Sequence, residues 1–210
     1  MKFKNYVFAA ASTAVSSILA AAALAFVSAP ASAAFSPLAI GLFAPVQFPP
    51  SDFSVTGLRL NIFLGDHRDV YGVNLGLFGS MTEQQFVGLG VSGLFNYNKG
   101  ATSAVFLQAA GVANVNVNKA SVVGVQVAGV INSNVAESSI VGIAFAPVNL
   151  SPNTKIYGVS AGIYNSDNEV FGFQIGLINM VDHLHGLQIG LVNINRQGLF
   201  YIAPILNVGF

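Results

Sequence analysis

The chain contains no cysteine and no tryptophan, and only 8% of its 210 residues are charged. Without cysteine it can form no disulfide framework, no iron–sulfur cluster and no cysteine-ligated zinc site. Its eight basic and eight acidic residues cancel, so it lacks the basic surplus that neutralises nucleic-acid phosphates. Intrinsic disorder is excluded because the charge is too low and the hydrophobic content of 53% too high. We therefore expect a folded protein that binds no nucleic acid.

The N-terminal segment, from Met1 to Ala33, has the composition of a secretory signal peptide. Lys2 and Lys4 precede a stretch of small and aliphatic residues, and Ala31-Ser32-Ala33 supplies a small-residue cleavage site. An N-terminal membrane anchor is the competing interpretation, but the uninterrupted apolar segment is shorter than the ~20 residues that span a bilayer. We predict an exported protein whose mature part, residues 34–210, is a single β-repeat domain.

The mature part is built from repeated units of similar but unequal length. The two best copies run from Gly172 to Asn179 and from Gly186 to Asn193. The structural repeat positions shared by these copies are Gly172, Gln174, Gly176 and Asn179 in the first, and Gly186, Gln188, Gly190 and Asn193 in the second. About ten units start near Gly57, Gly72, Gly88, Phe106, Gly124, Gly142, Gly158, Gly172, Gly186 and Phe200.

Bulky and small side chains alternate within each unit. Phe173 and Ile175 fall on one side of the predicted strand, and Gln174 and Gly176 fall on the other. Strict alternation in a segment rich in Val, Ile and Phe is typical of a β-strand. The pattern predicts an all-β protein with no helix after the signal peptide.

The unit length favours antiparallel connections. A strand of about nine residues is roughly 30 Å long, and the roughly five residues left in the shortest units cannot return that distance. We therefore predict an antiparallel β-meander closed as a small β-barrel, whose strands match the ~9–11 residues that cross a bilayer. Its aliphatic face would contact outer-membrane lipid. Phe210, which ends the last apolar strand, resembles the membrane assembly signal of outer-membrane barrels.

A β-solenoid is the alternative fold. Each unit would then break into shorter strands that stack on the next unit, with the aliphatic face as a dry core and Gly, Gln and Asn facing water or stacked in ladders. The near identity of consecutive units favours this fold. The variation in unit length counts against it, because a coil that changes length must change its cross-section.

Four segments resemble a family of bacterial surface-repeat proteins of leptospiral type. They are Val55-Thr-Gly-Leu-Arg-Leu60, Asp69-Val-Tyr-Gly72, Gly186–Asn193 and Pro204–Phe210, and the resemblance covers the chain from Leu38 onward. It implies an exported surface or outer-membrane protein without catalytic residues. The spacing Q-x-G-x-x-N, which occurs at Gln174 and Gln188, is also similar to curli-type repeats and supports the solenoid alternative.

Three motifs resemble functional sites. Gly158–Gly162 spells G-x-S-x-G around Ser160, the pattern of a serine hydrolase, but Ser160 holds the repeat position of Gln174 and no helix follows it. The residues that follow in the order of a hydrolase triad are Asp167, Asp182, His183 and His185. Gly88–Gly93 spells G-x-G-x-x-G, again without a helix.

His183 and His185 form the third motif, an H-x-H pair that could bind a metal, and a solvated pair is the commoner outcome. Asp66–Asp69 has the composition of a hydrated turn. We expect no catalysis, no cofactor and no metal. The sequence thus predicts an exported surface or outer-membrane protein with a structural or surface-interaction role. The alternatives are a self-associating solenoid and, with little support, a hydrolase.

Overall fold

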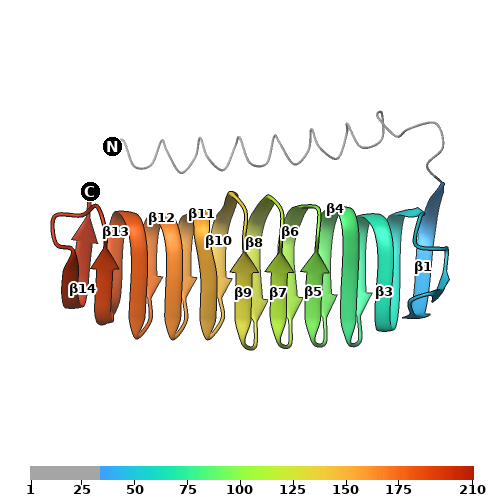
Figure 1. Ribbon diagram of the computed structural model, residues 1–210, viewed down its shortest axis with the longest axis horizontal. Helices are drawn as coiled ribbons and strands as arrows, with labels where there is room; N and C mark the ends of the chain where they lie inside the picture. The colour runs from blue at the N-terminus through green and yellow to red at the C-terminus, as the bar shows by residue number, and fades with distance from the viewer. Residues whose placement is uncertain (1–33) are drawn as a thin grey trace.

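Neighbouring repeat units lie side by side throughout residues 34–210, which wind as a β-solenoid of about ten turns (Figure 1). The computed structural model describes residues 34–210; the predicted signal peptide lies outside them. The strands are β1 (Phe35–Phe43), β2 (Val46–Phe48), β3 (Ser54–Gly76), β4 (Gly79–Ser92), β5 (Phe95–Asn98), β6 (Ala101–Ala110), β7 (Ala113–Asn116), β8 (Ala120–Ala128), β9 (Ile131–Asn134), β10 (Ser138–Phe145), β11 (Val148–Ala161), β12 (Tyr164–Ile175), β13 (Ile178–Asn195) and β14 (Ile202–Gly209). Within this part of the chain no helix is long and apolar enough to cross a membrane.

The strands pair in parallel at equivalent repeat positions. Gly172 of β12 lies opposite Gly186 of β13, and Gln174 lies opposite Gln188. Among the described strands only β1–β2 and β13–β14 pair antiparallel. The all-β prediction is confirmed, but the antiparallel barrel is wrong, and the alternative solenoid is the observed fold.

In most units a glycine bends the chain and allows even the shortest units to complete a coil. Gly172 has a φ of +137°, and a Cβ at this position would lie 2.1 Å from the carbonyl oxygen of Gly158 in the preceding coil. Only glycine fits such a bend and such a close approach without strain. The barrel prediction treated each apolar run as one straight strand, and this bend is the reason that it failed.

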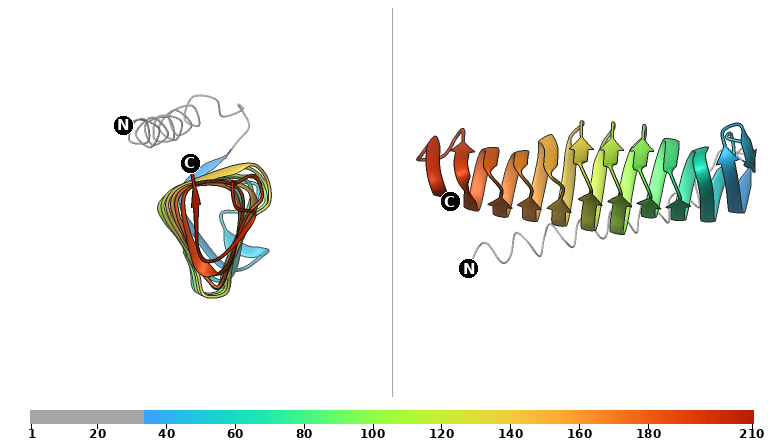
Figure 2. Two further views of the ribbon diagram at one scale, coloured as in Figure 1. Left: turned by 90° about the vertical axis from the view of Figure 1, so that its left-hand side faces the viewer. Right: turned by 90° about the horizontal axis from the view of Figure 1, so that it is seen from below.

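Viewed along its long axis, the solenoid is triangular in outline (Figure 2, left). We name its three corners by their residues. The glycine corner comprises Gly72, Gly88, Gly124, Gly142, Gly158, Gly172 and Gly186, with Phe106 at the same position. The apolar corner comprises Ile62, Phe63, Leu77, Phe78, Leu94, Val112, Val130, Pro147, Ile163, Leu177, Ile178, Leu191 and Val192. The charged corner comprises Glu83, Lys99, Lys119, Glu137, Lys155, Glu169, Asp182 and Arg196.

The longer units place additional residues at the charged corner. Val117–Lys119 separates β7 from β8, and Val135–Glu137 separates β9 from β10. The shortest coils need no such break, and β12 and β13 pass this corner as continuous strands. Variation in unit length is therefore compatible with a constant stack.

The interior combines one aliphatic column with columns of buried amides. Val122, Ile140, Ile156 and Val170 stack in register as the aliphatic column and are fully buried. Gln174 is also fully buried, whereas Ile175 is 41% exposed. The expected alternation is correct, but the solenoid alternative assigned the faces wrongly, because most of the aliphatic face lies outside.

Hydrogen bonds along the stack explain why amides are stable inside. Asparagine Nδ2 donates to Oδ1 of the next coil through Asn96, Asn114, Asn132, Asn149, Asn165, Asn179 and Asn193, at 2.8 to 3.0 Å. The same amide group also donates to a backbone carbonyl; that of Asn165 reaches Ile175 O at 2.9 Å. Buried amides that find such partners avoid the desolvation cost of unpaired polar groups.

Candidate functional site

The outer side of the solenoid carries a continuous apolar surface. It comprises the apolar corner and the adjoining outward columns that run from the glycine corner, and we call it the apolar face. The exposed members of those columns are Leu60, Val73, Leu75, Ile143, Phe145, Phe173, Ile175 and Ile189. At the corner, Leu177 is 51% and Leu191 is 66% exposed. Soluble monomers rarely expose contiguous apolar patches of more than a few hundred Å², so this face has the character of a contact surface.

Charged side chains lie away from this face. At the charged corner, salt bridges join successive coils: Lys99 Nζ to Glu83 Oε1 at 2.6 Å, Lys155 Nζ to Glu169 Oε2 at 2.8 Å, and Arg196 to Asp182 at 3.0 Å. Arg59 and Asp167 point inward and are buried. Throughout residues 34–210, no Asp, Glu, Lys or Arg contributes to the apolar face.

The apolar face is hollowed where a coil carries small residues. Ala161 and Gly162 lie between the larger side chains of Phe145 and Ile175, which occupy the same column in the preceding and following coils. The resulting open cavity has a volume of about 400 Å³. The apolar face is therefore uneven, and the side chains that surround this hollow are apolar.

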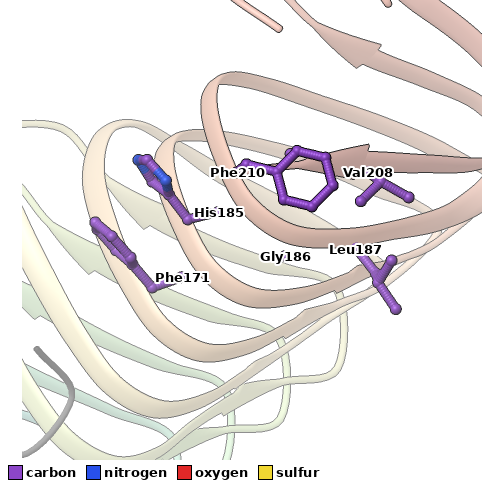
Figure 3. A pocket seen from close by; sticks show the side chains of 7 residues that line it. Phe171, His185, Gly186, Leu187, Val208 and Phe210 are labelled. Atoms are coloured by element: carbon purple, nitrogen blue, oxygen red, sulfur yellow. The ribbon is translucent and has the colours of Figure 1, made fainter. Parts of the chain in front are cut away.

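A second apolar cavity lies between β13 and β14 (Figure 3). Its volume is about 640 Å³, and Phe171, His185, Leu187, Val208 and Phe210 line it together with two glycines. Phe171 and His185 stack face to face in successive coils, as Figure 3 shows, with ring centroids 4.5 Å apart. Sequence analysis missed this site, although His185 and Phe171 occupy the same repeat position.

The N-terminal coils bury a cation and a histidine. Arg59 donates to Asn74 Oδ1 at 2.8 Å and to Met81 O at 2.7 Å, and burial lowers its pKa to about 9. His67 Nε2 lies 3.2 Å from Pro49 O, and burial lowers the pKa of His67 to about 4. These contacts hold Arg59 and His67 within the protein, so we assign them a structural role.

The predicted hydrolase residues do not come together as a triad. Ser160 is fully buried in β11, beside the carboxyl group of Asp167. Asp167 is buried nearby, where it accepts a hydrogen bond from Gln174 Nε2 at 2.9 Å. Burial raises the pKa of Asp167 to about 7. His183 and His185 lie on the outside of the coil, where neither could activate a buried serine.

The H-x-H pair, the G-x-G-x-x-G motif and the Asp66–Asp69 segment each form part of the folded solenoid. His185 stacks on Phe171, with Nε2 3.6 Å from Glu169 Oε1, and residues 34–210 contain no group of three or more His, Cys, Asp or Glu side chains placed to hold a metal. Gly88 of the G-x-G-x-x-G motif lies at the glycine corner within β4. The Asp66–Asp69 segment is not the hydrated turn that its composition predicts: it lies within β3, His67 and Asp69 are buried, and Arg68 pairs with Asp69 at 2.9 Å.

The repeat positions build the stack rather than a reactive centre. Gln174 and Gln188 hydrogen-bond to each other at 2.7 Å inside the solenoid. Gly172 and Gly186 form the glycine corner, Asn179 and Asn193 belong to the asparagine ladder, and Gly176 and Gly190 leave room for those asparagines. Phe210 is 99% exposed beside the 640 Å³ cavity. The barrel in which it would act as an assembly signal does not form.

Comparisons with protein-family models, curated proteins and solved structures give no match for this chain. The resemblance to surface-repeat proteins therefore remains a prediction.

Proposed function

We propose that this chain is an exported, non-catalytic β-solenoid that adheres to a lipid surface of the bacterial envelope through its apolar face. The observation that carries the proposal is the separation of the two surfaces. Exposed aliphatic side chains run along one corner and one side, and the exposed charges lie at the opposite corner. A structure divided in this way can bury apolar area in the acyl region while its charges stay hydrated.

The lack of charge on the apolar face specifies the kind of lipid contact. A protein attracted mainly by anionic headgroups needs clustered Lys or Arg at the contact, and this face, within the part of the chain that the structure describes, has none. We therefore propose that burial of apolar area, rather than electrostatic attraction, supplies the affinity, and that adhesion needs no anionic lipid.

The burial of Ser160 and Asp167 supports the absence of catalysis. Both side chains face the interior of the stack and are shielded from solvent. An exported scaffold on the outer membrane or cell surface needs no reactive group, and its stability comes from the ladders along the stack.

Sedimentation with neutral phosphatidylcholine vesicles tests the proposal. The wild-type protein should sediment with the vesicles equally well at low and high salt, because the contact is apolar. Leu177→Lys with Leu191→Lys should reduce partitioning at least about tenfold, since both side chains leave the lipid contact. Asn153→Lys with Gln197→Lys adds the same charge away from the apolar face and serves as the control. Equal loss in both variants, or a wild-type protein that stays in the supernatant, would contradict the proposal.

Self-association is the second candidate, and β14 favours it. This strand pairs with β13 on one edge only, and exposed apolar residues, including Tyr201 and Ile202, lie at its start. Open, apolar strand edges are templates for pairing with another chain. Sedimentation of the protein without vesicles, or formation of fibres, would favour this candidate over lipid adhesion.

A further inference from the structure

Three consecutive coils carry a stack of aromatic rings at their outer surface. The ring centroids of Tyr157 and Phe171 are 4.9 Å apart with planes inclined by 6°, and those of Phe171 and His185 are 4.5 Å apart with planes inclined by 9°. The three residues occupy one repeat position, so the rings follow the spacing of neighbouring strands. The backbone thus sets the distance at which a further ring would stack.

The stack stops at His185 because the next strand reverses direction. In β14, Gly209 lies opposite Gly186 and Val208 lies opposite Leu187. This register brings Phe210 next to His185, but the Phe210 side chain is 99% exposed and does not pack on the imidazole. The ring face of His185 that points away from Phe171 therefore borders the cavity between β13 and β14 (Figure 3).

We propose that this cavity binds a planar, uncharged aromatic molecule that stacks on His185 as the next ring of the series. The cavity volume of about 640 Å³ is in the range of small-molecule sites, and it admits two fused rings. Leu187 and Val208 contact the edge of the ligand, and the exposed ring of Phe210 closes over its second face. Aromatic rings prefer such offset-stacked contacts.

The site differs from the apolar face in its place and its lining. It lies at one end of the solenoid rather than along its length (Figure 1), and the His185 ring, which is not part of the apolar face, borders it. Leu187, which lies opposite Phe173, belongs to both surfaces. Planarity is therefore the property by which a ligand would be selected here, whereas lipid adhesion selects only for apolar area.

NMR titration of the full chain with 2-naphthol tests the proposal. Both ring protons of His185 should shift upfield and saturate, because they enter the shielding zone of the stacked naphthalene, while those of His183 stay unchanged. Decahydro-2-naphthol has a similar size but no flat ring, and it should bind about tenfold more weakly. Equal binding of the two probes, or no saturable shift, would overturn the proposal. A shift of the His185 protons that grows with protein concentration before any probe is added would also overturn it, because a second copy would then fill the cavity.

A pair of variants adds a second test. Phe210→Ala removes one of the two stacking surfaces and should weaken 2-naphthol binding by about fivefold. Phe173→Ala removes an exposed aromatic ring that does not line the cavity and should leave the affinity unchanged. Equal effects of the two substitutions would show that the probe adheres to apolar surface in general, and the proposal would fail.

Discussion

The side chain of Asn165 donates a hydrogen bond from Nδ2 to Oδ1 of Asn179, 2.8 Å away in the next coil, and neither side chain has exposed surface. Asn165 Oδ1 accepts the equivalent bond from Asn149, also at 2.8 Å. This chain of amides ties successive coils together on the inside, where a typical globular protein would place only apolar side chains.

Asn165→Ala should lower the free energy of unfolding by about 2 kcal/mol. The substitution leaves one N–H of the Asn149 amide and the Asn179 Oδ1 acceptor without partners, whereas the Ile175 carbonyl keeps the hydrogen bond from Gly162 N. Each buried polar group left unpaired costs about 1 kcal/mol or more. Urea denaturation followed by circular dichroism measures the loss. Ser166→Ala, at the neighbouring outward position, is the control and should change the free energy of unfolding by less than about 0.5 kcal/mol. Equal losses in the two variants would show that the asparagine ladder does not stabilise the fold.

Asp167→Asn should remove a dependence of stability on pH. Burial raises the pKa of Asp167 to about 7 in the folded protein, against its usual value of 3.8. As pH rises from 4 to 7, the unfolded chain ionises first, so stability falls by up to about 4 kcal/mol and then levels off above the folded pKa. The asparagine variant has no such charge and keeps the hydrogen bond with Gln174.

The measurement is the difference in unfolding free energy between Asp167→Asn and the wild type at several pH values. His67, whose lowered pKa makes stability fall below about pH 6.5, contributes equally to both proteins and cancels. The variant should gain stability relative to the wild type between pH 4 and 7. A difference that does not change with pH would contradict the assignment.

Phe106→Gly should stabilise the fold by about 1 kcal/mol. Phe106 has a φ of +70° and lies opposite Gly124 at the glycine corner. A non-glycine residue in this conformation is strained by about 1–3 kcal/mol, which exceeds the entropic cost of introducing glycine. The ring is 77% exposed, so little packing is lost. A lower thermal midpoint in the variant would show that the strain argument is wrong.

Gly158→Ala should have the opposite effect and cost about 3 kcal/mol or more. Its φ is +141°, and the new Cβ would lie 2.1 Å from the carbonyl oxygen of Gly142, which belongs to the backbone of the preceding coil and cannot move independently. Gly90→Ala is the matched control, since its nearest neighbour is the outer tip of the Phe86 ring at 3.1 Å. Similar unfolding midpoints for the two variants would rule out a special role for the glycine corner.

The sequence was sufficient to predict the strands and the sides on which their residues fall. Gln174 and Ile175 lie on opposite sides of β12, as their alternation indicates. The direction of neighbouring strands could not be predicted in the same way. It depends on the bend at Gly172, and glycine in a sequence permits a positive φ without requiring it.

It was harder still to predict which of the two sides of each strand faces the interior of the solenoid. Hydrophobicity favours Ile175 for the interior, yet Gln174 is buried because the next coil supplies a partner in Gln188 at 2.7 Å. Such a partner exists only after the register between coils is fixed. Recurrence of Gln and Asn at one repeat position was the available signal, because a stacked ladder needs the same amide in successive coils. The cavity beside His185 depends on the reversal at β14, which no repeat pattern contains.

Spin labels on paired cysteines test the parallel stack most directly, and the chain has no cysteine of its own. The pairs are Ile175→Cys with Ile189→Cys, and Tyr164→Cys with Ile178→Cys, taken from opposite ends of the β12–β13 contact. In parallel coils both pairs lie about 5 Å apart at the backbone, so both doubly labelled proteins should give strong dipolar broadening in their electron paramagnetic resonance spectra. A sharp spectrum from either pair would contradict a solenoid with these coils in register.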